Sequence, residues 1–374
     1  MRKKTTEEDP NFGKFNLRID ERNLVPRFNH NELLNFSEQL LAIGGMPADD
    51  AKLVAKLLVK ADLRGYPGHG VTRVAPYLAW IKDGTINLRE GPRIVREGKI
   101  TAVIEGNHYI GQAAAHMAMK LAIRKAKEHG VGVVTLRRAS HSGRLADYME
   151  MAADAGMIAM GAVSVGSGTT TLYGGMERII GTHPMAFGIP ARNGRHIILD
   201  FATASMSMGE IQKRVAKKEA IPDGVILDGH GNPTNDFKAF RGPPRGVFLP
   251  FGGHKGSGVA LITEILGGLL SGNGLAKHWW DKGGHGINGV FLEAITVEEF
   301  QPLDEFLDRV DELIAFVKSR KTAPGFKEIL LPGEQGRQNE ARQIKEGVEI
   351  DQATWTELKQ VAEELGIHQL PKPL

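Results

Sequence analysis

Apolar residues recur every three or four positions near the start of the chain and predict two amphipathic helices. The first begins at a cap on Asn29 or Asn31 and ends at Gly44-Gly45, with apolar positions at Leu33, Leu34, Phe36, Leu40 and Leu41. The second follows at once and ends at Gly65, with a stripe of Leu53, Val54, Leu57, Leu58, Ala61 and Leu63. A third, shorter helix is predicted over 72–81.

From about residue 100 the pattern changes to strands that alternate with helices. The apolar run ITAVIEG precedes an alanine-rich helix over 113–128, and a β-branched strand over 131–136 follows it. Further strands are predicted at 157–163, 196–201, 225–228, 247–250 and 290–297. A long apolar helix is predicted over 256–271, and the chain after Leu303 is again mostly helical.

This order predicts three parts of the chain. Residues 1–27 are polar without a period and form an N-terminal arm. A mainly helical domain is built from both chain ends, 28–98 plus 303–374, around an α/β domain over 99–302. The α/β class follows from the alternation of strands and helices.

Composition excludes several classes of protein. The 374 residues contain 47 basic and 44 acidic side chains, a net charge of +3 that gives no basis for nucleic-acid binding. The absence of cysteine excludes disulfides and thiolate chemistry. The thirteen histidines form no metal-ligand motif, so we expect no metal. We find no signal peptide or membrane span and expect a cytoplasmic location without a membrane partner.

The turn after the second helix holds the first candidate for chemistry. His69 stands among Pro67, Gly68 and Gly70, where it could give and take a proton at neutral pH. Arg73 follows, and its guanidinium matches a carboxylate at two points. The alternatives are a histidine that satisfies a helix end and an arginine in a surface salt bridge.

Two further segments offer proton-transfer groups. His141 lies in RRASHSGR, between a strand and a helix start, where free backbone N–H groups favour anions. Asp200 ends an apolar strand in LDFAT, where it could orient His69 or cap the next turn.

The glycine-rich segment FGGHKGSG suggests a phosphate site. Lys255 and the backbone amides at this helix start could bind a pyrophosphate, although a flexible turn is the alternative. The segment lacks the spacing of the nucleoside-triphosphate loop, and no Gly-x-Gly-x-x-Gly follows a strand. A standard Rossmann domain is therefore disfavoured.

Seven motifs occur in an order typical of one family. They are ADLRGYPGHGVTR, RRASHSGRLADYMEMAADAGMI, GTHPMAFGIP, HIILDFATASMSMGEI, FGGHKGSGVALITEILGGLLSG, GINGVFLEAI and ILLPGEQ. Over residues 30–367 the chain resembles the malate/L-lactate dehydrogenase type 2 family. The resemblance implies an NAD(P)-dependent oxidoreductase and a homodimer. It also implies a non-Rossmann cofactor fold with a largely antiparallel central sheet, in which 99–302 bind the cofactor.

The resemblance also implies roles for particular residues. His69, in the helical domain, is then the acid that protonates the new hydroxyl, with Asp200 as its relay partner and His141 near substrate and nicotinamide. Arg73 would hold the substrate carboxylate. Arg144, which the resemblance does not cover, is predicted as a second substrate-binding residue. The residues implied to bind the dinucleotide are Ser142, Thr182, His183, His196, Ile197, Ile198, Leu199, Asp200, Phe201, Ala202, His254, Lys255, Gly333, Glu334 and Gln335.

Some positions depart from the family pattern. Gly68 replaces a usual serine, His183 replaces an asparagine, Glu210 replaces a lysine and Arg144 replaces a small residue. We infer an altered substrate, larger or with a second anionic group, or a shifted cofactor preference. Neither NAD nor NADP is favoured, since no acidic residue is assigned to the ribose 2′-hydroxyl.

The primary hypothesis is reversible hydride transfer between NAD(P)H and a 2-oxo acid, which gives a 2-hydroxy acid. One alternative is reduction of a cyclic imine carboxylate. A second is a catalytically altered homologue that binds ligands or serves as a structural dimer, and a third is a lyase or hydratase that uses His69 without a cofactor.

Overall fold

A mixed sheet forms the centre of the structure, a computed structural model that describes residues 25–280 and 287–374. The sheet has seven strands in the order β2-β3-β4-β11-β5-β6-β7. They are β2 (Arg93–Glu97), β3 (Thr101–Glu105), β4 (Val131–Ala139), β5 (Met157–Val165), β6 (Met185–Ile189), β7 (Ile197–Phe201) and β11 (Asn288–Thr296). Among the neighbouring pairs of these seven strands, β3 and β4 pair in parallel and all the others pair antiparallel. The expectation of an α/β fold with a largely antiparallel central sheet is confirmed.

Alternating residues of β11 place the helices on opposite faces of this sheet. Val290 and Leu292 pack with α4 (Gly111–His129) and α5 (Ala146–Asp154), whereas Phe291 packs with α8 (His254–Thr263). The predicted long helix over 256–271 is confirmed, but it continues past α8 as a π-helical turn, Glu264–Leu270. The Glu264 carboxylate accepts hydrogen bonds from Ser164 Oγ at 2.5 Å and Ala276 N at 2.7 Å, which fixes the start of this turn.

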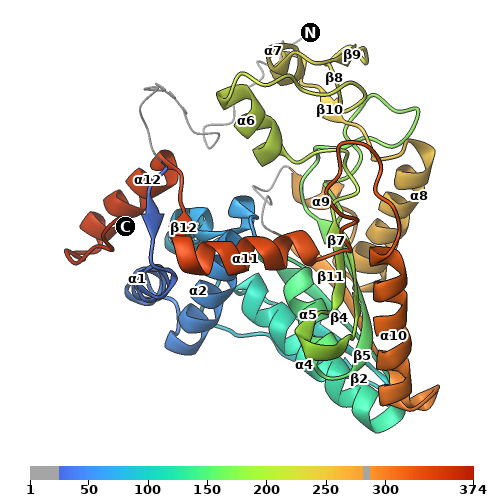
Figure 1. The fold of residues 1–374 in the computed structure, drawn as a ribbon. Coiled ribbons are helices and arrows are strands. Elements are labelled where there is room, and N and C mark those ends of the chain that lie inside the picture. Colours follow the sequence, from blue (N-terminus) through green and yellow to red (C-terminus); the bar gives the residue numbers. More distant parts are fainter. Residues whose placement is uncertain (1–24, 281–286) are drawn as a thin grey trace.

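The two chain ends share a separate hydrophobic core. Its helices are α1 (His30–Ile43), α2 (Ala48–Leu63), α3 (Val74–Lys82) and α12 (Gln352–Glu364). Strand β1 (Arg27–Phe28) pairs with β12 (Val348–Glu349), and the Phe28 and Trp355 rings lie 4.4 Å apart. Asn29 caps α1 by accepting hydrogen bonds from the N–H groups of Asn31 and Glu32. Figure 1 shows these helices gathered on one side of the sheet.

A small lobe carries a second sheet beyond the end of β7 (Figure 1). Its strands are β8 (Ile226–Leu227), β9 (Pro233–Thr234) and β10 (Val247–Phe248), beside α6 (Met208–Ala216) and α7 (Phe237–Arg241). A third core, which includes Ile211 and Phe240, fills the lobe.

The last long helices connect these parts. Arg192, before β7, pairs with Asp304 and Asp308 of α10 (Leu303–Lys318), so α10 lies beside the central sheet. In α11 (Glu334–Glu346), the Gln343 amide donates to the backbone carbonyls of Asp62 at 2.8 Å and Leu63 at 3.0 Å. The short helix α9 covers Lys277–Trp280. The predicted domain boundaries stay predictions, and most of the predicted arm lies outside the described residues.

Across the described ranges, no helix is both long and apolar enough to cross a membrane.

Candidate active site

A rigid turn presents His69 at the end of α2. It consists of two 3-10 turns, Pro67–His69 and Val71–Arg73. Asp62, only 4% exposed, accepts a hydrogen bond from Val71 N at 2.7 Å. A Cβ on Gly70 would lie 1.8 Å from the Asp62 Oδ1 atom, so only glycine fits at this position. The turn is therefore anchored to the helix that precedes it.

Two histidines from different parts of the chain meet at this turn. The rings of His69 and His141, which follows β4, are stacked with their centroids 5.3 Å apart and an angle of 13° between their planes. His141 Nδ1 lies 2.6 Å from the hydroxyl of Tyr77 in α3. The Nδ1 atom of His69 is enclosed and has no hydrogen-bond partner among the described residues. The structure thus brings together the two histidines that the sequence singled out.

Two arginines flank the histidine pair. Arg73 Nε donates to the carbonyl of Gly68 at 2.7 Å, which orients its guanidinium at the turn. Arg144 is 6% exposed, lies 5.2 Å from the Tyr66 ring centroid and pairs with Asp147 at 2.7 Å. Its Nε has no partner among the described residues.

A buried ion-pair network continues behind Arg144. Lys60 of α2 pairs with Asp147 at 3.4 Å and also contacts Glu150. Arg64 joins Glu150 at 3.2 Å to Glu340 of α11 at 2.6 Å. The network connects α2 and α11 to α5, and so fixes the helix that begins beside the histidine pair.

The surroundings keep both histidines neutral. Burial, followed by the charges of Arg73 and Arg144, lowers the pKa of His69 to about 3. Burial, Arg73 and His69 hold the pKa of His141 well below its usual value. At neutral pH the pair therefore carries no charge, while two fixed cations stand beside it.

Asp200 does not form the direct contact that the resemblance implies. Its Oδ2 accepts a hydrogen bond from Ala146 N at 2.8 Å, at the start of α5 and not in the turn that follows β7, and no hydrogen bond to His69 is found in the described structure. Burial raises the pKa of Asp200 to about 6. As placed, Asp200 is linked to the site through α5 and through its charge interaction with Arg144.

Several residues assigned to the dinucleotide lie side by side. Strand β7, which carries Ile197–Phe201, is an edge strand, and Ile198 N donates to Pro332 O at 3.2 Å. Gly333 adopts a left-handed conformation with φ 87°, and its Cβ position lies 3.3 Å from Ile198. The structure therefore brings the stretch 196–202 next to 333–335, as expected if both contact one ligand.

Other side chains that the resemblance assigns to the dinucleotide are already hydrogen-bonded to residues of the chain itself. His183 is 0% exposed and pairs with Glu264 at 2.8 Å, so its side chain does not face a ligand. His196 pairs with Asp154 and accepts from Ala191 N. Ser142 is buried and donates to Asn288 from both N and Oγ, and the Thr182 carbonyl accepts from Thr203. Glu334 accepts from Lys318 Nζ, which leaves Gln335 more accessible than Glu334.

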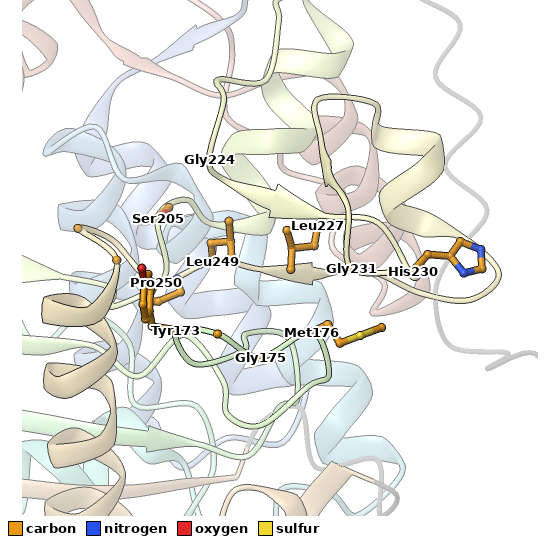
Figure 2. A pocket seen from close by; sticks show the side chains of 13 residues that line it. Tyr173, Gly175, Met176, Ser205, Gly224, Leu227, His230, Gly231, Leu249 and Pro250 are labelled. Carbon is orange, nitrogen blue, oxygen red and sulfur yellow. The ribbon is translucent and has the colours of Figure 1, made fainter.

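Lys255 lies at the start of α8. Gly252 and Gly253, with φ of 57° and 63°, form the turn before it, and the His254 ring lies 5.9 Å from that of Tyr173. A pocket of about 540 Å³ opens here, between this turn, the loop at Tyr173 and the small lobe. Figure 2 shows Ser205, Leu227 and Leu249 along its wall.

No group of three or more potential metal ligands was found in residues 25–280 and 287–374.

The sequence analysis did not identify some residues that shape the site. Tyr77 follows Arg73 by one helical turn, a spacing that could have indicated a shared face. Nothing local pointed to Tyr66 or Asp147.

The sequence between residues 28 and 359 matches the malate/L-lactate dehydrogenase family. The chain belongs to this family. It is 39% identical to the L-sulfolactate dehydrogenase of Methanocaldococcus jannaschii over 328 residues, which cover 87% of this chain and 93% of that protein. The structure titled malate dehydrogenase from Pyrococcus horikoshii superposes with a TM-score of 0.84 at 33% identity, covering 92% of this chain and 97% of that one.

A second solved structure widens the comparison. The Δ1-piperideine-2-carboxylate reductase of Pseudomonas syringae superposes with a TM-score of 0.80 at 26% identity, covering 90% of this chain and 99% of that one. A protein named malate dehydrogenase and one named Δ1-piperideine-2-carboxylate reductase thus share this fold.

A serine at position 68 should be accommodated. A Cβ at Gly68 has no atom within 4 Å, and the backbone is not left-handed. We expect Gly68→Ala and Gly68→Ser to fold and to gain about 0.4–1 kcal/mol through the less flexible unfolded chain. Thermal or denaturant unfolding measures this. A clear loss of stability in Gly68→Ala would show that the turn needs glycine for another reason.

Proposed function

We propose that the chain is a nicotinamide-dependent dehydrogenase that interconverts a 2-oxo acid and a 2-hydroxy acid. The observation that carries the proposal is the stacked pair of His69 and His141 beside the free end of Arg73. A 2-oxo acid needs a clamp for its carboxylate and a proton for its carbonyl oxygen, and these side chains supply both. Membership of the family supports the same activity.

The residues present fit a dinucleotide. The left-handed Gly252–Gly253 turn leads into α8 with Lys255 and free N–H groups, a chemistry that suits pyrophosphate. The β7 edge and the turn at Gly333 provide an extended second surface. When bound, the nicotinamide would supply or accept the hydride. We propose a non-Rossmann site on 99–302, with NAD or NADP as cofactor.

After burial, the charge of Arg73 is the next cause of the low pKa of His69. With its pKa at about 3, His69 is neutral at pH 7 and lacks the second ring proton that an imidazolium acid would deliver. A carboxylate bound to Arg73 cancels one of the cations that lower this pKa. His69 then gains a proton when the substrate binds, and the proton is held for the carbonyl oxygen.

Binding of a 2-oxo acid should therefore be accompanied by proton uptake. We expect the pKa of His69 to rise from about 3 by the contribution of Arg73, while burial and Arg144 still lower it, so uptake should grow as the pH is lowered from 8 toward 6. Calorimetry in buffers of different ionisation enthalpy measures it. The oxidised cofactor together with the 2-oxo acid gives a complex that cannot turn over. Equal uptake in His69→Gln would assign the proton to another group.

We propose that Arg144 holds a second anionic group of the substrate. The side chain is buried, its Nε lacks a partner in the described structure, and its charge acts on His69. Two relatives are named for malate and sulfolactate, which both carry two anionic groups. A monoanionic substrate would leave the Nε of this arginine without an acceptor among the described residues.

Replacing Arg144 should change selectivity between substrates. In Arg144→Leu we expect the KM for oxaloacetate to rise about 10-fold or more, with little change for pyruvate, because one charge-assisted hydrogen bond is lost. Asp147→Asn is the matched control, since it breaks the ion pair and keeps the cation. Equal effects on both substrates would assign Arg144 to structure alone.

The decisive test measures cofactor and substrate together. NADH and NADPH are titrated separately by fluorescence, and 2-oxo acids and cyclic imine carboxylates are then screened for loss of reduced cofactor. Turnover of a 2-oxo acid supports the proposal, whereas preference for the imine would favour the second candidate, suggested by the piperideine carboxylate reductase structure. Turnover without nicotinamide would indicate a lyase or hydratase. Cofactor binding without any turnover would indicate a ligand-binding homologue.

We also propose a homodimer. Large apolar side chains are exposed along α8 and the π-helical turn, at Leu261, Ile262, Ile265, Leu269 and Leu270. Light scattering of the purified chain would separate a monomer from a dimer. The cytoplasmic location stays a prediction.

A further inference from the structure

Tyr77 is a buried tyrosine whose hydroxyl contacts a residue from another part of the chain. It lies in α3, in the core formed by the chain ends, and is 1% exposed. Its hydroxyl lies 2.6 Å from Nδ1 of His141, which follows a strand of the central sheet. This hydrogen bond therefore joins the helical part of the chain to the α/β part at the histidine pair.

The direction of the hydrogen bond follows from the partners available. The described residues offer the Tyr77 hydroxyl no acceptor other than His141. If Nδ1 carried the hydrogen and donated it to Tyr77, the buried phenolic O–H would be left unsatisfied, which is costly. Burial also raises the pKa of Tyr77, so the phenol stays protonated. The hydroxyl is the donor and Nδ1 the acceptor.

A neutral histidine that accepts at Nδ1 carries its hydrogen on Nε2. His141 stays neutral, because burial and then the charge of Arg73 hold its pKa well below the usual value. Among the described residues Nε2 has no hydrogen-bond partner, and it is not one of the enclosed unpartnered atoms. It can therefore donate to a ligand in the site.

We propose that Tyr77 is a positioning residue, whose hydroxyl selects the His141 tautomer that donates from Nε2 to the substrate oxygen. His69 and His141 then have different tasks: His69 delivers the proton, and His141 stabilises the negative charge that develops on the oxygen. This inference rests on the proposed function for its catalytic consequence, but the tautomer itself does not depend on any substrate.

The test combines nuclear magnetic resonance and kinetics on the full chain. Histidine labelled with ¹⁵N reports which ring nitrogen carries hydrogen, and His141→Gln assigns the signal. We expect Nε2–H in the wild type and a mixture of tautomers in Tyr77→Phe. With the best 2-oxo acid, kcat of Tyr77→Phe should fall about 5- to 20-fold, as for one lost hydrogen bond, with little change in KM.

Tyr109→Phe is the matched control. It also removes a buried tyrosine hydroxyl, which donates to Asp50 at 2.5 Å, and it should leave the His141 tautomer and kcat unchanged. A wild-type His141 protonated at Nδ1 would overturn the proposal even if Tyr77→Phe failed to fold. Unchanged tautomer and kcat in folded Tyr77→Phe would also overturn it. If no 2-oxo acid is turned over, the proposed function fails while the spectrum still decides the tautomer.

Discussion

Replacement of His69 by alanine should lower kcat about 10²-fold or more, because a positioned acid commonly contributes that much. The His69 turn is held by the Asp62 contact to Val71 and not by the imidazole, whose Nδ1 has no partner in the part of the chain that the structure describes. The variant should therefore fold normally. Steady-state kinetics with the best 2-oxo acid measures the loss, and cofactor titration shows whether NAD(P)H still binds.

His69→Gln provides the control for shape. It keeps a polar side chain of similar reach and removes the titrating group, so it should be as inactive as His69→Ala. If either variant kept the activity of the wild type, the acid would be another residue. His141 is the first candidate to examine, since its ring is stacked on that of His69.

Arg73→Ala should mainly raise KM, by about 10- to 100-fold, because hydrogen bonds to charged groups contribute about 1.5–3 kcal/mol. Two features of the structure favour this result: Nε is held by the Gly68 carbonyl, and the terminal nitrogens have no partner among the described residues. Arg73→Lys should recover part of the affinity, since it restores the charge without the two-point geometry. Initial rates over a range of 2-oxo acid concentrations measure both. An unchanged KM would exclude Arg73 from the site.

Much of the fold could be predicted from local patterns. Asn29 and Gly44-Gly45 bound α1 because caps and glycines act within a few residues, and the β-branched run after Val131 forms β4. The π-helical turn could not be predicted. At its start Glu264 contacts Ser164, His183 and Ala276. These partners lie far from Glu264 in the sequence, and no local pattern indicates that they meet.

In the candidate site, too, some residues could be predicted from the local sequence and others could not. The glycines and the proline around His69 and Arg73 indicate a turn from the local sequence, and His141 follows a predicted strand. The arrangement around them depends on long-range packing: Asp200 bonds to Ala146 and not to His69, and His183 is buried against Glu264. The sequence alone indicates only that Tyr77 is a core tyrosine, because its contact with His141 comes from the fold.

The link from Gln343 to the carbonyls of Asp62 and Leu63 has a consequence for synthesis of the chain. These carbonyls belong to the helix end that carries the His69 turn, yet their partner is made about 280 residues later. During translation the N-terminal helices leave the ribosome long before α11 and β12 exist. The end of α2 therefore gains these two hydrogen bonds only after every strand of the central sheet has been synthesised, whereas the contact of Asp62 with Val71 can form early.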